Sequence, residues 1–101
     1  MELEILVLRK NYKTLVNEKF SINLTKTELL ILEALAKKKD RAEGSDLLIY
    51  LMNKDPKTYK GLPMCISRLR KKLKTKTNAE NIFIAIRNHG YYLKPPIVIS
   101  N

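Results

Sequence analysis

"LPMCISRLRKKLKTK", residues 62–76, is the part of the sequence that decides the fold. Proline suits the first turn of a helix, so we expect a helix to begin at Leu62 and Pro63. Helical residues are spaced by about 100°, which places four apolar residues of this stretch on one narrow stripe. They are Leu62, Ile66, Leu69 and Leu73. We expect this stripe to be the buried face of the helix.

The opposite face of the same helix combines several kinds of side chain. It carries Met64, Ser67, Arg68, Lys71 and Thr75, with Lys60 and Lys74 at its margins. Residues 60–76 include seven basic residues and no acidic one. A face that only needs solvation usually interleaves acids, and a membrane-surface helix has a broader apolar face with aromatic residues. The pattern favours a surface that meets DNA, with a solvated face and a membrane or RNA surface as alternatives.

Composition limits the class of protein. The chain has 101 residues, which suits one domain over residues 1–101. Hydrophobic residues make up 45% and charged residues 30%, as in soluble globular proteins, and the net charge of +10 favours polyanionic partners. No apolar run approaches the roughly 20 residues that span a membrane, and no signal peptide is visible. The single cysteine, Cys65, fits a reducing compartment, so we expect a cytoplasmic protein without membrane contact.

The segments before this helix predict a small sheet and two further helices. Three short strands are expected in residues 1–24, as an antiparallel sheet. A helix then follows Thr25, which can form a capping box with Glu28. A shorter helix is expected after Gly44 or Ser45, and its expected core residues are Leu47, Leu48, Leu51 and Met52. Residues 25–75 are therefore expected to form a three-helix core.

A β-hairpin is expected directly after the basic helix, over residues 82–94. "IFIAI" (82–86) and "YYL" (91–93) have the composition of strands, and "RNHG" (87–90) that of a turn. A hairpin in this position is a wing. Arg87 lies at its tip or base, where a guanidinium can enter a minor groove.

Three motifs in this order and spacing resemble the OmpR/PhoB family of winged-helix response regulators. They are "LTKTELLIL" in the first helix, "ISRLRKKL" in the third and "IRNHGYYL" in the wing. The resemblance runs from the N-terminal strands to Leu93. It implies an α+β fold: a winged helix-turn-helix with an N-terminal antiparallel sheet, three helices and a C-terminal hairpin wing.

The resemblance also implies a role for individual residues. In the recognition helix, Arg68 would contact bases, with Met64 and Ser67 beside it. The implied phosphate contacts are Arg70, Lys71, Lys60 and Tyr91, with Lys74 at the margin of the same face, and Arg87 would reach the minor groove. From the residues alone, an intramolecular ion pair remains open for Arg70. One of Tyr91 and Tyr92 is expected in the core, because they alternate across a strand.

These patterns predict a sequence-specific regulator of transcription that binds double-stranded DNA. No enzyme is expected, and neither a cofactor nor a metal site, because the sequence has no metal-ligand spacing and no phosphate-cradling glycine loop. The alternatives are a protein–protein module that binds RNA polymerase or another regulator, and a nonspecific DNA coater of the nucleoid type. We expect a monomer in solution and tandem pairs on DNA. The sequence contains no receiver domain, which leaves both a standalone regulator and an excised domain open.

Overall fold

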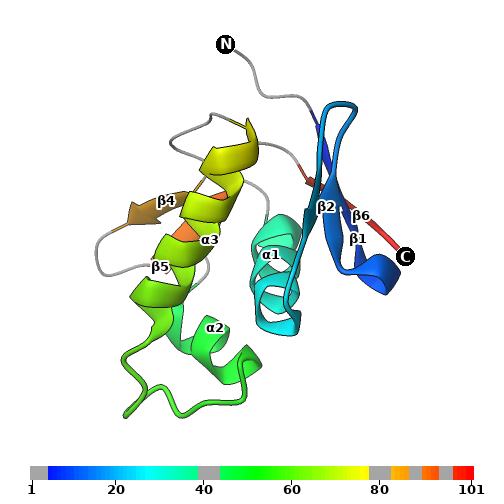
Figure 1. Ribbon diagram of the computed structural model, residues 1–101. Helices are drawn as coiled ribbons and strands as arrows, with labels where there is room; N and C mark the ends of the chain where they lie inside the picture. Colours follow the sequence, from blue (N-terminus) through cyan, green and yellow to red (C-terminus); the bar gives the residue numbers. More distant parts are fainter. Residues whose placement is uncertain (1–4, 39–43, 78–82, 87–89, 94–96) are drawn as a thin grey trace.

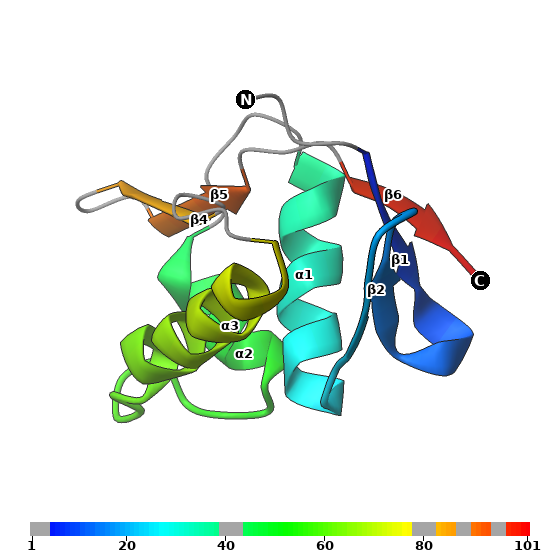
Figure 2. The same ribbon diagram turned by 45° about the horizontal axis from the view of Figure 1, so that its top comes forward.

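Helix α1 (Lys26–Lys38) lies between a four-stranded sheet on one side and helices α2 and α3 on the other (Figures 1 and 2). The computed structural model describes residues 5–38, 44–77, 83–86, 90–93 and 97–101. The predicted capping box begins α1: the Glu28 amide donates to Thr25 Oγ1 at 3.1 Å, and the Thr25 amide donates to Glu28 Oε1 at 2.8 Å. This pair satisfies two main-chain donors at the start of the helix, so that prediction is confirmed.

The four strands are β1 (Leu6–Arg9), β2 (Thr14–Val16), β3 (Ser21–Asn23) and β6 (Ile97–Ser100), in the order β3-β2-β1-β6. A short 3₁₀ turn, η1 (Lys10–Tyr12), joins β1 to β2. The first three strands pair antiparallel, as the sequence predicts. Alternate residues point toward α1 and are buried, since side chains alternate across a strand. They are Leu6, Leu8, Leu15 and Ile22.

Strand β6 was not predicted. It pairs parallel with β1, with Leu6 opposite Ile97 and Arg9 opposite Ser100, so the sheet is mixed. Ile97 and Ile99 pack against the core, whereas Val98 between them is exposed. The final strand therefore returns the chain to its N-terminal sheet, and α1 contacts both this sheet and the hairpin.

Helix α2 (Ser45–Leu51) starts after Gly44, whose extended backbone forms the N-cap. Its end is a Schellman motif: the Asn53 amide donates to the Tyr50 carbonyl at 2.9 Å and the Lys54 amide to the Ile49 carbonyl at 3.2 Å. Asn53 has φ 63°, a left-handed conformation that asparagine tolerates.

The predicted core face of α2 is partly wrong. Leu48 is buried as expected, but Leu47 is 43% exposed and Ile49 is buried in its place. Leu51 and Met52 are half-buried. The segment is apolar almost all round, so its periodicity alone does not select the face that meets the other helices.

Helix α3 (Leu62–Thr77) buries the stripe that the sequence predicts. The four residues Leu62, Ile66, Leu69 and Leu73 are each at most 2% exposed. They join the residues from the sheet, α1 and α2 in one core. With α2 and the loop between them, α3 forms the helix-turn-helix arrangement, and its other side is left exposed (Figure 1).

The hairpin consists of β4 (Phe83–Ile86) and β5 (Gly90–Leu93), paired antiparallel with Ile86 opposite Gly90. Gly90 has φ 123°, a conformation that glycine adopts readily because it lacks a Cβ. The α+β winged-helix fold is thus confirmed, with the hairpin beside α3 (Figure 2). The expected turn at residues 87–89, including Arg87, lies outside the described residues.

Candidate nucleic-acid interface

The exposed face of α3 brings together five of the predicted site residues. They are Met64, Ser67, Arg68, Lys71 and Lys74, and each side chain is exposed. Met64 is a large apolar residue with 56% of its surface in solvent. The face follows the i, i+3, i+4, i+7 spacing that places side chains on one side of a helix. It offers a guanidinium fork, a hydroxyl, ammonium groups and an apolar group within successive turns, which is the range of chemistry that base edges and phosphates require.

The other predicted site residues have different surroundings. Lys60 is exposed in the loop just before α3. Arg70 is half-buried on the flank of the helix, with its Nε beneath the surface. Tyr91 of β5 is half-buried and packs against the core, as expected for one of the two adjacent tyrosines. Lys60 is therefore exposed like the five residues of α3, whereas Arg70 and Tyr91 are half-buried.

Tyr59 anchors the start of α3. Its hydroxyl and Cys65 Sγ share a hydrogen bond of 3.5 Å, and its ring lies so close to Gly61 that an added Cβ there would overlap it. The hydrogen bond with Cys65 raises the pKa of the Tyr59 hydroxyl above its ordinary value, and desolvation and the electrostatic interaction with Cys65 add to this. The positive charge of Arg68 opposes the rise. The contacts of Tyr59 therefore connect the loop to the start of α3.

Lys72 is a residue of this helix whose role the sequence did not reveal. Its Nζ lies 2.7 Å from Glu28 Oε1, the same carboxylate that caps α1. It also donates to the main-chain oxygen of Asn23 at 3.1 Å. Both partners are more than 40 residues away in the chain, so no local spacing indicates the contact. Lys72 thus ties α3 to the N-terminal end of α1.

Comparison with known proteins identifies the family. The family model described as "Transcriptional regulatory protein, C terminal" matches residues 17–93. The chain belongs to this family. The OmpR/PhoB resemblance is thereby confirmed, and the chain is a DNA-binding effector domain of a transcription regulator. The family is one of DNA-binding domains and not of enzymes.

A solved relative agrees with this assignment. The crystal structure of the DNA-binding domain of CpxR from E. coli matches with a TM-score of 0.74 and 25% sequence identity. The match covers 97% of this chain and 95% of that chain. A search of curated proteins found no match. The sequence pattern and the winged-helix fold therefore both support the family assignment.

Two further properties concern only the described parts of the chain. Among these residues, no cluster of three or more histidine, cysteine, aspartate or glutamate side chains could hold a metal ion. Within the same ranges, no helix is long and apolar enough to cross a membrane.

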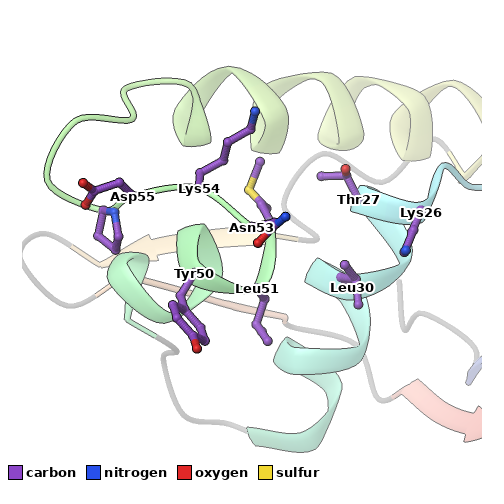
Figure 3. Close-up of a pocket in the computed structure, with 10 residues that line it drawn as sticks. Lys26, Thr27, Leu30, Tyr50, Leu51, Asn53, Lys54 and Asp55 are labelled. Atoms are coloured by element: carbon purple, nitrogen blue, oxygen red, sulfur yellow. The ribbon is translucent and has the colours of Figure 1, made fainter.

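A groove lies between the first turns of α1 and the end of α2 with the loop that follows it (Figure 3). Lys26, Thr27 and Leu30 line one side, and Tyr50, Leu51 and Lys54 line the other. Tyr50 is 69% exposed there. None of the groove's lining residues belongs to the predicted DNA-binding set. The groove and the exposed face of α3 therefore share no residue.

Proposed function

We propose that this effector domain binds specific sequences in double-stranded DNA, with α3 in the major groove and the hairpin wing at the minor groove. The observation that carries the proposal is the exposed face of α3, which combines Arg68, Lys71, Ser67 and Met64 opposite a fully buried stripe. A protein that binds DNA without sequence preference needs only positive charge, whereas this face also has groups suited to base edges. We further propose that residues 1–101 act as one unit in the cytoplasm.

The proposed roles follow from exposure and side-chain chemistry. Arg68 contacts bases, because a guanidinium can donate two hydrogen bonds to a guanine edge. Met64 and Ser67 lie beside it and complete the base-facing surface. Lys71, Lys74 and Lys60 bind phosphates as exposed point charges. Arg70 and Tyr91 are proposed phosphate contacts from the margins, since both are half-buried.

Arg87 is the proposed contact of the wing. The strands that precede and follow the turn are paired as a hairpin, with β5 packed against α1. A guanidinium carried on such a hairpin is suited to a narrow, A·T-rich minor groove, where the negative potential is concentrated. The wing would then add contact at the flank of the site that α3 reads.

The first test separates base reading from positioning. A selection from a random duplex library would supply the preferred site. On that site we expect Arg68→Ala to weaken binding by about 1–3 kcal/mol and to relax the preference at one base position. Lys71→Ala should weaken binding to preferred and random duplexes alike, because a phosphate contact carries no sequence information. Equal losses for Arg68→Ala on both duplexes would contradict the proposed base contact.

The second test concerns assembly on DNA. One module of this size covers few base pairs, so we propose that two copies bind tandem half-sites about one helical turn apart. Moving one half-site by about half a turn should abolish cooperative binding and leave single-site binding intact, as measured by the mobility of the complexes. Light scattering of the free protein should show a monomer. Cooperativity that survives the shift, or a dimer without DNA, would contradict tandem pairing.

A protein partner is a second proposal, and the groove in Figure 3 is the observation that favours it. Its lysines and exposed Tyr50 lie outside the proposed DNA face, so RNA polymerase or another regulator could be contacted while DNA is bound. A Tyr50→Ala variant that keeps its DNA affinity but loses activation in a purified transcription assay would support this partner.

A further inference from the structure

The side chain of Lys72 points away from the exposed face of α3 and toward the start of α1. Its ammonium group forms an ion pair with Glu28 at 2.7 Å and donates to the Asn23 carbonyl at 3.1 Å. These two acceptors come from α1 and from the end of β3. Lys72 therefore joins the recognition helix to two other elements of the fold through a single charged group.

The carboxylate of Glu28 is held from both sides. The oxygen that accepts from Lys72 also accepts from the Thr25 amide at 2.8 Å. The side chain of Glu28 is only 14% exposed, against 37% for Lys72. Leaving a partly buried carboxylate without a cation costs free energy. The ion pair is therefore favoured over a solvated Lys72.

We call the contact of Lys72 with Glu28 and the Asn23 carbonyl the tether. Its position on α3 has a consequence for DNA binding. Lys72 follows Arg68 by four residues, so the two side chains start next to each other on the helix surface. A released Lys72 could reach a neighbouring phosphate. The tether instead holds its ammonium group against Glu28 and the Asn23 carbonyl, and a contact at the edge of the exposed face opposes rotation of α3 about its axis.

We propose that Glu28 and Lys72 are positioning residues: they hold α3 in the rotation that Arg68 needs to contact bases, and they withhold the charge of Lys72 from the phosphate backbone. This inference rests on the proposed function. Phosphate contacts stabilise binding to every sequence, whereas base contacts depend on the orientation of the helix. The orientation that the tether gives α3 should therefore affect discrimination between sequences, whereas release of the Lys72 charge should affect binding to every sequence.

The test uses three variants of the full chain on a preferred and a random duplex. Lys72→Met removes the ammonium and keeps an unbranched side chain. Lys72→Arg restores a cation and its donors. Glu28→Gln removes the charge but keeps an amide oxygen for the Thr25 amide, since glutamine also forms capping boxes. Circular dichroism would set a temperature at which all three are folded.

Lys72→Met should lower affinity for the preferred duplex about two- to fivefold, a change comparable to the worth of an exposed ion pair. Affinity for the random duplex and its salt dependence should not change, because Lys72 does not contact phosphate. Lys72→Arg should restore discrimination. Glu28→Gln should make the salt dependence steeper by about 0.9, since the released lysine gains one phosphate contact.

Two results would overturn the inference while leaving the proposed function intact. The first is a Lys72→Met variant that weakens binding to both duplexes and flattens the salt dependence, because Lys72 would then be a phosphate contact. The second is a variant that loses thermal stability but keeps full discrimination, which would make the tether structural only. A wild-type chain that does not distinguish the two duplexes would instead overturn the proposed function itself.

Discussion

Affinity for duplex DNA should fall about 100-fold between 50 and 200 mM salt. Each phosphate that a basic side chain of the protein neutralises releases about 0.9 counterions from the DNA. Four basic residues on and beside α3 are the proposed phosphate contacts that carry charge. They are Lys60, Arg70, Lys71 and Lys74. Four neutralised phosphates give a slope of about −3.6 in a plot of log affinity against log salt concentration. Fluorescence anisotropy of a labelled duplex would measure it.

A matched pair of lysine substitutions locates the source of this salt response. Lys71→Gln should reduce the slope by about 0.9, because one phosphate contact is lost. Lys13→Gln should leave the slope unchanged. Lys13 is also exposed, but it lies in the turn between η1 and β2, which α1 and the sheet separate from α3 (Figure 2). Equal effects of the two substitutions would show that net charge, and not the face of α3, governs the attraction to DNA.

The sequence predicts the structure correctly where a feature depends on residues that are close together in the chain. The Thr25–Glu28 capping box is a contact between residues three apart, so it could be recognised before the helix was seen. The buried stripe of α3 was recognisable for a similar reason. Its apolar residues are separated by polar ones at helical spacing, which leaves one choice of buried face. Five candidate contacts on the opposite side of α3 followed from that choice.

The features that were missed depend on contacts between distant parts of the chain. Strand β6 follows two prolines, and its parallel pairing with β1 joins the two ends of the described chain, where no local pattern sets the register. In α2, the apolar residues surround the helix, so only the positions of α1 and α3 determine that Ile49 and not Leu47 is buried. In the sequence, Lys72 is one more basic residue of α3, and no local pattern indicates its ion pair with Glu28, which lies 44 residues away.

Substitutions of the apolar residues Leu69 and Met64 test which face of α3 belongs to the core and which face binds DNA. Leu69 is 0% exposed within the core, and we expect Leu69→Ala to lower the free energy of unfolding by about 2–5 kcal/mol. Met64 is 56% exposed, and Met64→Ala should change the same quantity by no more than about 0.5 kcal/mol. Urea unfolding followed by circular dichroism would measure both.

The DNA affinities of these two variants should follow the opposite order. Met64→Ala removes a side chain from the proposed base-facing surface, so it should weaken binding to the preferred duplex in a protein that remains fully folded. Leu69→Ala changes no exposed group, so the fraction that stays folded should bind with nearly wild-type affinity at low temperature. A domain of this size has only about 5–15 kcal/mol of stability, so the loss at Leu69 is large enough to make unfolding visible on mild warming. If Met64→Ala were instead the destabilising change, the assignment of the two faces of α3 would be reversed, and with it every DNA contact proposed for this helix.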